Sequence, residues 1–168
     1  SVAVAAAGPV DTEKGLFYPP NIDQEVVHIH EHLEKYGGVE IVNDCAAAVL
    51  GEYHYGETSD SLLYVTISSG IGAAYIENGK LVQGETGNFG EIGHMKLGNK
   101  LKCGCGGTGH WEAYCSGDNI PKMVKKLYNL EVDNAKEIFQ SDKPEAEKAL
   151  QKFREKIGEG IINLINMY

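Results

Sequence analysis

The chain has 168 residues, of which 42% are hydrophobic and 23% charged, and it carries a formal net charge of −9. These proportions are typical of a globular chain long enough for a core of its own. The acidic balance argues against a nucleic-acid surface in this portion, since such surfaces gather Lys and Arg. No apolar run reaches the ~18 residues of a membrane helix. With four cysteines and no secretory leader, the chain is expected in the cytoplasm, where thiols stay reduced.

Strands and helices alternate in the first third of the sequence. The small apolar run SVAVAAA (1–7) predicts a buried strand closed by a Gly-Pro pair. From Asp23 to Tyr36, apolar residues at helical spacing predict a helix with Asp23 as its N-cap and two glycines as its stop. A short strand, VEIVN (39–43), and an alanine-rich helix, DCAAAVLGEYHYG (44–56), are expected next.

The rest of the chain predicts a hairpin, a further strand and three helices. SLLYVTIS (61–68) predicts a strand, AAYIENGKLV (73–82) a hairpin turned at an Asn-Gly pair, and EIGHMKL (91–97) a short strand. Helices are expected around IPKMVKKLY (120–128), around NAKEIFQ (134–140) and from Pro144 to Met167. The apolar face expected on the last helix consists of Ala149, Phe153, Ile157, Ile161, Leu164 and Ile165. This alternation indicates an α/β fold.

A glycine-rich segment near residue 100 carries the residue types of a metal site. Its candidate ligands are His94, Cys103, Cys105 and His110. Two imidazoles and two thiolates form a complete tetrahedral set for Zn²⁺. The Cys-x-Cys spacing is tighter than in zinc fingers, and the alternative is a glycine-rich turn with incidental thiols. The other two cysteines, Cys45 and Cys115, are expected to be small buried hydrophobes on helices.

The histidine run HIHEH (28–32) also invites a metal interpretation. On a helix, His28 and His32 lie on one face while His30 points elsewhere. The neighbouring Glu31 and Glu34 favour a solvated surface instead, so a functional site is not expected there.

Three further groups of residues can contact a ligand. Asn43 and Asp44 follow a strand, where Asp44 is either a helix cap or a general base for a substrate hydroxyl. The stretch TISSGIGAAYIENGK (66–80) contains either a phosphate-binding loop or a plain hairpin with a tight turn. Glu91, His94 and Glu112 lie close to the candidate metal ligands, and several acids near one place suit a polyhydroxyl ligand.

Taken together, these motifs resemble the ROK family of sugar kinases and sugar-responsive repressors. The most specific match is GEIGHMKLGNKLKCGCGGTGHWEAYCSG (90–117). In chain order, the further matching segments are GPVD with PPN, NDCAAAVLGE, and SSGIGAAYIENGKLVQGE. The resemblance covers almost the whole chain and implies a partial actin/hexokinase-like (ribonuclease H-like) α/β fold with a zinc-bound loop.

The resemblance implies ATP-dependent phosphorylation of a hexose hydroxyl, for example the 6-hydroxyl of glucose or a related sugar. Asp44 would be the general base, and ATP would come with Mg²⁺. The implied sugar contacts are Gly8, Asn21, Asn43, Asp44, Glu91, His94 and Glu112. The implied phosphate contacts are Ser69, Gly70 and Gly72.

In the family, the histidine that matches His94 gives one ring nitrogen to a structural zinc and turns the other toward the sugar. His110 stands here where the family has a third zinc cysteine. The phosphate loop also departs from the family pattern, because it has Ser68, Ser69, Ala73 and Ala74 where glycines and a threonine are usual.

Residues 1–168 resemble the central part of a ROK kinase, with the zinc motif at 94–110 and without the first phosphate segment or the adenosine segment. The chain alone is therefore expected to turn over poorly or not at all. A homodimer is possible by resemblance, and no membrane partner is expected. The alternatives are a sugar-sensing repressor of the same family and a non-catalytic zinc-stabilised module.

Overall fold

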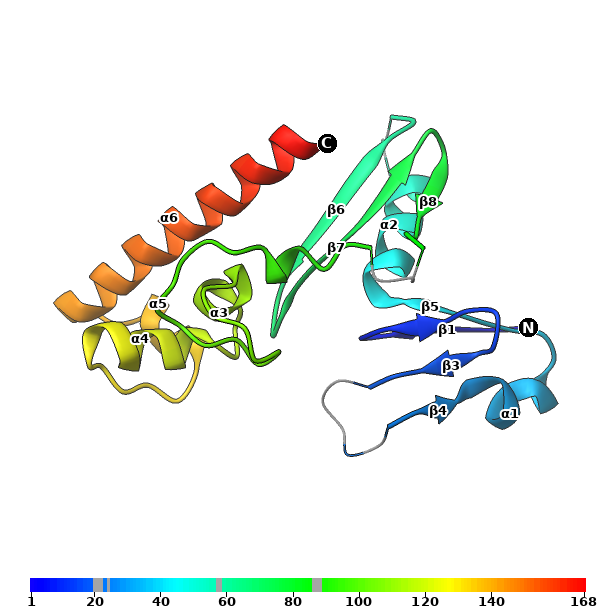
Figure 1. The fold of residues 1–168 in the computed structure, drawn as a ribbon, viewed down its shortest axis with the longest axis horizontal. Helices are drawn as coiled ribbons and strands as arrows, with labels where there is room; N and C mark the ends of the chain where they lie inside the picture. Colours follow the sequence, from blue (N-terminus) through cyan, green and yellow to red (C-terminus); the bar gives the residue numbers. More distant parts are fainter. Residues whose placement is uncertain (20–22, 24, 57–58, 86–88) are drawn as a thin grey trace. The chain divides into compact units, whose positions relative to one another are not determined.

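Short apolar runs form a parallel pair of strands in the N-terminal part of the chain. In the computed structural model, which describes residues 1–19, 23, 25–56, 59–85 and 89–168, β1 (Val2–Ala6) pairs with β5 (Val39–Asn43), as Figure 1 shows. The register runs from Val2 opposite Val39 to Ala6 opposite Asn43. Since the strands are parallel, the residues that follow them emerge at the same edge.

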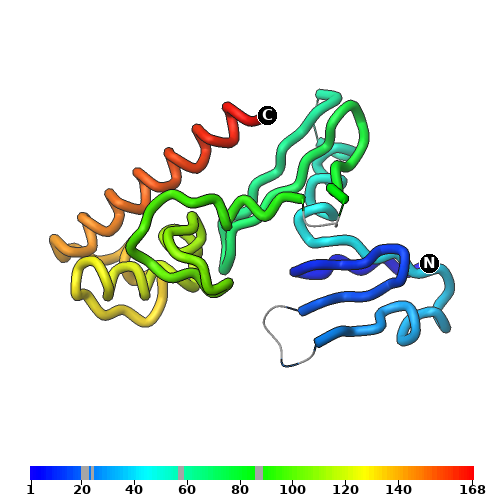
Figure 2. Tube along the Cα trace, in the orientation of Figure 1, coloured from blue at the N-terminus to red at the C-terminus, as the bar shows by residue number. Residues whose placement is uncertain are grey.

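The chain divides into two compact units. Unit 1 contains Ser1–Val65 and Ala73–Gly90, and unit 2 contains Thr66–Gly72 and Glu91–Tyr168. The trace in Figure 2 can be followed by colour from the blue strands of unit 1 to the yellow and red helices of unit 2. Neither unit contains a helix, among the described residues, that is long and apolar enough to span a membrane.

The core of unit 1 lies between a helix and a three-stranded antiparallel sheet. The helix is α2 (Asp44–Tyr55), and the strands are β6 (Leu62–Ile67), β7 (Ile71–Glu77) and β8 (Lys80–Val82). The buried core residues are Cys45, Val49, Ala74 and Ile76. Asn78 and Gly79 have φ of 50° and 76°, as a two-residue hairpin turn requires, which confirms the predicted turn.

A small antiparallel sheet in unit 1 corrects the helix predicted from Asp23 to Tyr36. Its strands are β2 (Val10–Asp11), β3 (Leu16–Phe17) and β4 (Val27–His28). Among the described residues of this span, only Ile29–Leu33 form an α-helix, α1, and the 3₁₀ turn η1 (Glu34–Tyr36) ends at Gly37 with φ of 110°. The pairing of β3 with β4 has overridden the helical spacing of this segment, while the predicted glycine stop is confirmed.

Four helices and a 3₁₀ turn build unit 2. They are η2 (Ile92–His94), α3 (Trp111–Cys115), α4 (Ile120–Tyr128), α5 (Ala135–Phe139) and α6 (Pro144–Met167). The largest side chains buried between them are Trp111, Met123 and Ile138, each at most 1% exposed. The three helices predicted after residue 118 are confirmed.

Three predictions about local environment are wrong or partly wrong. The segment EIGHMKL forms η2 and a single bridge from Lys96 to His110, not a strand. On α6, Ile161 and Ile165 are 42% and 73% exposed, because the face that packs on the other helices is formed by Ala146, Ala149, Leu150, Gly160 and Leu164. Strand β1 is buried only at Ala6, since β5 is its one partner among the described residues.

Candidate functional site

Three of the predicted sugar-site residues lie together in unit 1, at the carboxyl ends of β1 and β5. The Asn43 side-chain amide donates to the carbonyl of Gly8 over 3.2 Å, which ties the two strand ends together. Asp44 follows directly as the first residue of α2. Ligand sites of open α/β sheets are found at such edges.

The structure settles which of the two residues caps α2. The Oδ1 atom of Asn43 accepts hydrogen bonds from the backbone N–H groups of Cys45 (2.9 Å) and Ala46 (3.4 Å), so Asn43 is the N-cap. The Asp44 carboxylate is exposed and accepts a bond from the Cys45 N–H over 2.9 Å. Within the described ranges it has no other hydrogen-bond partner, which leaves lone pairs of the carboxylate available to a ligand.

The predicted phosphate loop joins β6 to β7 in unit 2. It turns through a hydrogen bond from the Ser68 N–H to the Gly70 carbonyl (2.9 Å). Residues that follow α3 hold the loop, because the N–H groups of Gly117 and Asp118 donate to the carbonyls of Ser68 (2.6 Å) and Ser69 (3.3 Å). The side chains of Ser68 and Ser69 remain exposed.

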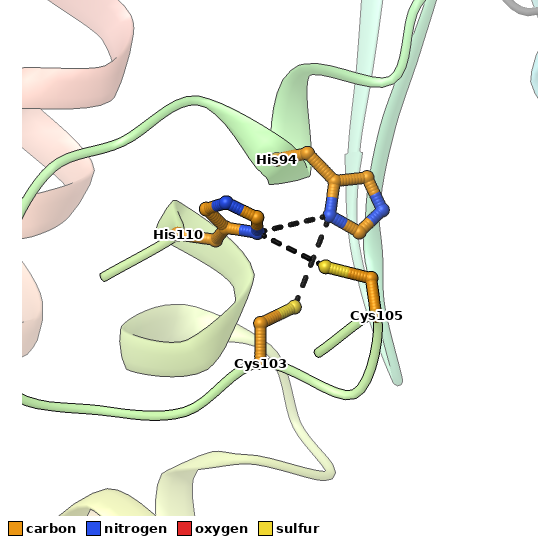
Figure 3. Close-up of side chains that lie close together, drawn as sticks. All are labelled: His94, Cys103, Cys105 and His110. Carbon is orange, nitrogen blue, oxygen red and sulfur yellow. Dashed lines mark hydrogen bonds between the residues drawn. The ribbon is translucent and has the colours of Figure 1, made fainter. Parts of the chain in front are cut away.

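The four candidate metal ligands converge in unit 2 (Figure 3). One ligand atom from each residue lies within 4.8 Å of all the others. The Nδ1 atoms of His94 and His110 are 3.3 Å apart, Cys105 Sγ is 3.2 Å from His110 Nδ1, and Cys103 Sγ is 3.8 Å from His94 Nδ1. The convergence predicted from the sequence is confirmed.

These distances fit one tetrahedral ion. Bonds of ~2.0–2.1 Å to nitrogen and ~2.3 Å to sulfur place two nitrogens ~3.3 Å apart and a nitrogen and a sulfur ~3.5 Å apart. The observed N···N separation is 3.3 Å, and the two N···S separations, 3.2 and 3.8 Å, lie on either side of the ideal. The donor set and its geometry therefore suit Zn²⁺.

A tight backbone turn presents the two thiols. The Cys103 N–H donates to the Gly107 carbonyl (2.9 Å) and the Gly106 N–H to the Cys103 carbonyl (3.0 Å). Gly106 has φ of 88°, which a glycine adopts without strain. Cys103 is buried and burial raises the pKa of its thiol, whereas Cys105 is exposed. The metal-free site therefore holds Cys103 as a thiol, and a bound cation would have to displace its proton.

The predicted acids of unit 2 lie next to the candidate ligands. The second ring nitrogen of His94, Nε2, is 3.5 Å from the carboxylate of the exposed Glu91. Glu112 accepts a hydrogen bond from the Ile71 N–H (3.2 Å), and its other oxygen is 3.9 Å from Cys103 Sγ. Glu112 thus connects the metal cluster to the start of β7, a contact that spacing in the sequence could not predict.

The histidines His28 and His30 and the other two cysteines make contacts of an ordinary structural kind. His28 pairs with Glu31 at 3.1 Å on the surface, and the His30 ring fills the space above Gly15, so the HIHEH run does not form a cluster. Cys45 and Cys115 are buried on α2 and α3 as predicted. Asn21 lies outside the described residues.

Unit 1 contains a pocket that the sequence did not predict. It has a volume of about 650 Å³, and Asn43 reaches its wall. The other walls include the turn after β2, from Thr12 to Glu13, and the strand β8 with the residues after it, from Leu81 to Glu85. Because its lining comes from segments distant in the chain, only the folded structure could reveal it.

Two kinds of protein are similar in sequence to most of this chain. A glucokinase of Pyrobaculum calidifontis is 36% identical over 155 residues, which are 90% of this chain and 52% of the relative. A xylose repressor of Bacillus subtilis is 31% identical over 176 residues, covering 99% of this chain and 45% of the repressor. The chain therefore spans about half the length of these relatives.

Solved structures agree with these matches. The ROK hexokinase from Thermus thermophilus superposes with a TM-score of 0.83 at 32% identity, over 96% of this chain and 57% of that one. A ROK family glucokinase from Streptomyces griseus, solved with glucose and AMPPNP, gives a TM-score of 0.77 at 28% identity, over 98% of this chain and 61% of that one. The actin/hexokinase-like fold expected from the resemblance is confirmed.

The sequence model of the ROK family matches residues 1–168, which is the whole chain. Motifs, fold and relatives agree, and the chain belongs to the ROK family.

Proposed function

We propose that this chain carries the sugar site and the catalytic base of a hexose kinase that uses ATP with Mg²⁺. The observation that carries the proposal is the pairing of Asn43 and Asp44 at the carboxyl ends of two parallel strands. Asn43 caps α2, so the exposed Asp44 carboxylate is left with acceptor capacity for a substrate hydroxyl. Glucokinases among the relatives support the same reading.

In the proposed reaction, Asp44 accepts the proton of a hexose hydroxyl while that oxygen bonds to the γ-phosphorus of ATP. The bond to the bridging oxygen breaks, and ADP leaves. Positioning and electrostatics account for most of the rate enhancement in such transfers. Ser69, Gly70 and Gly72 are the proposed phosphate contacts, because small residues let a phosphate approach the backbone: Ser69 is exposed, Gly70 is half-buried in the turn, and Gly72 follows in β7.

The residues proposed to contact the hexose are those that the family resemblance implies. They are Gly8, Asn21, Asn43, Asp44, Glu91, His94 and Glu112. Carboxylates and an imidazole can each bond to sugar hydroxyls, and glucose or a related hexose fits this inventory.

The four converging ligands are proposed to hold a structural Zn²⁺. The donor distances support this assignment, and all four coordination positions are filled by protein. When bound, the ion would fix the ring of His94 through Nδ1 and leave Nε2–H, now near Glu91, to face a ligand. The ion has no part in phosphoryl transfer in this proposal.

A second candidate function is sugar sensing without catalysis. The xylose repressor that matches 99% of this chain favours it. Such a protein would bind a sugar through the same contacts and would not need Asp44 as a base. A third alternative, a metal-stabilised module without sugar affinity, predicts metal-dependent folding and no sugar binding.

The test is calorimetric titration of the zinc-loaded chain with a panel of hexoses, followed by assay of γ-phosphate transfer from labelled ATP. Asp44→Asn is compared with Glu40→Gln, which removes an exposed charge from β5, the strand that ends just before Asp44. Binding that weakens at least tenfold in Asp44→Asn alone supports the sugar site. Any phosphate transfer should be weak in this chain, and its loss in Asp44→Asn alone supports catalysis over sensing. No hexose binding by the zinc-loaded chain would contradict the assignment of the site to this chain.

A further inference from the structure

Helix α6 has a glycine at the point where the indole of Trp111 lies against it. A Cβ atom built on Gly160 would be 2.3 Å from Cε2 and Cζ2 of Trp111, closer than Cβ atoms approach other atoms in proteins. Trp111 is 0% exposed and Gly160 is buried. The indole therefore occupies the position of a side chain at residue 160, and only glycine leaves room for it.

Trp111 stands between two residues of the proposed sites. Its predecessor, His110, contributes Nδ1 to the ligand cluster, 3.3 Å from His94 Nδ1 and 3.2 Å from Cys105 Sγ. Its successor, Glu112, accepts the hydrogen bond from the Ile71 N–H. Adjacent Cα atoms are ~3.8 Å apart, so a displacement of the Trp111 backbone is passed to both neighbours.

The backbone of Trp111 also connects to the other histidine ligand. The Trp111 N–H donates to the carbonyl of Met95 over 2.8 Å, and Met95 directly follows His94. Because the indole is buried against α6, it fixes the Trp111 backbone, which is hydrogen-bonded to the residue that follows His94.

One turn earlier on α6, a second contact reaches the same loop. The Lys156 ammonium donates to the carbonyl of Leu97 (2.5 Å) and lies 5.6 Å from the centre of the Tyr114 ring. The Tyr114 hydroxyl accepts a bond from the Lys100 N–H (3.2 Å). Residues 156 and 160 are one helical turn apart, so α6 holds the ligand loop and α3 from one face.

We infer that the contact between Gly160 and Trp111 positions His110 for the metal ion and Glu112 for the hexose. Gly160 is a positioning residue, since it touches neither ligand. The part of the inference that concerns Glu112 rests on the proposed function. The part that concerns His110 depends only on the metal cluster.

Co²⁺ is the probe of the metal part, because its absorption spectrum reports the number of thiolates and the geometry around the ion. Gly160→Ala is expected to weaken Co²⁺ binding by about 10- to 100-fold, the range found when groups that orient metal ligands are removed. Its visible bands should also shift. The matched control is Gly158→Ala on the same helix, where a Cβ would have no atom within 4 Å. Its affinity and spectrum are expected to stay those of the wild-type chain.

A rescue variant separates positioning from general loss of stability. Trp111→Phe in the Gly160→Ala background makes room for the new methyl group. The double variant is expected to bind Co²⁺ within about threefold of Trp111→Phe alone, as a double-mutant cycle between contacting residues predicts. If Gly160→Ala does not fold, Trp111→Phe alone is the test variant. It is expected to bind Co²⁺ more weakly than the wild-type chain and to shift the visible bands of the bound ion. Circular dichroism records the folded fraction of every variant.

Two outcomes would overturn the inference. One is a folded Gly160→Ala chain with wild-type Co²⁺ affinity and spectrum, which would make the contact purely structural. The other is a wild-type chain that binds no Co²⁺. Hexose titration of the same variants tests the Glu112 part separately. If Co²⁺ binding depends on Gly160 but the chain binds no hexose, the positioning of His110 stands and the proposed function is rejected.

Discussion

Cys115 should make the stability of unit 2 depend on alkaline pH. The residue is 1% exposed at the end of α3, with its Sγ 3.8 Å from the Phe153 carbonyl. Burial raises the pKa of this thiol from 9.0 to about 12. The folded chain therefore holds the proton more tightly than the unfolded chain. The stabilisation is complete below pH 9.0 and is lost as the pH rises toward 12, because the unfolded thiol ionises first.

The magnitude follows from ~1.4 kcal/mol per pKa unit. The full difference corresponds to ~4 kcal/mol, of which ~2 kcal/mol is lost by about pH 10.5. Urea unfolding between pH 8 and 10.5 measures this loss, followed by the fluorescence of Trp111, the single tryptophan of the chain and a residue of unit 2.

Cys115→Ala is the control, because it removes the ionisable group and leaves the other titrating groups in place. Between pH 8 and 10.5, the free energy of unfolding of the wild-type chain is expected to fall by ~2 kcal/mol relative to that of Cys115→Ala. A difference that stays constant with pH would refute the argument, since it would mean that the Cys115 thiol has the same pKa in the folded and unfolded chains.

Three further predictions concern the cysteines and the two units. Metal-free chain treated with iodoacetamide should be alkylated first at the exposed Cys105, then at Cys103, and Zn²⁺ should protect both, as peptide mass spectrometry will record. Gly90→Ala should destabilise unit 1 by ~1–3 kcal/mol or more, because φ at Gly90 is 96° and a Cβ would be 1.9 Å from the Ala73 carbonyl oxygen. Gly38→Ala, with no atom within 4 Å, is its control in thermal unfolding, and equal losses would contradict the argument. Asn43→Ala should lower the free energy of unfolding by ~1 kcal/mol, because α2 loses its N-cap, whereas Asn43→Ser should keep most of the cap's contribution. Equal stability of the two variants in urea unfolding would count against the cap.

Local signals predicted those elements whose determinants lie close in sequence. The turn at Asn78 and Gly79 followed from the φ > 0 that this hairpin needs, and α6 followed from its long apolar repeat with a proline near the start. The segment from Asp23 to Tyr36 failed because its first part pairs with β3, a contact that helical spacing does not encode. On α6 the repeat identified a helix, but the neighbours that bury Gly160 decided which face is inward.

The candidate site shows the same division. Convergence of His94, Cys103, Cys105 and His110 was predictable, because metal ligands on a glycine-rich loop leave a recognisable spacing. The division of roles between Asn43 and Asp44 was not, since two adjacent polar residues could each cap α2 and only the folded backbone selects one. The hydrogen bond from the Ile71 N–H to Glu112 joins residues 41 positions apart in the sequence, so it could not be predicted either.

Helix α3 shows why these non-local contacts matter for the proposed function. Its N-cap is His110, its first turn contains Glu112, and the residues after its end, Gly117 and Asp118, hold the phosphate loop. A proposed metal ligand, a proposed sugar contact and the residues that hold the proposed phosphate loop therefore lie on one segment of nine residues, 110–118, which includes the buried Trp111. Because a rigid segment moves as a whole, a change in how α3 lies on α6 should alter all three together. Variants of α3 and α6 are thus expected to lose metal and hexose binding in parallel.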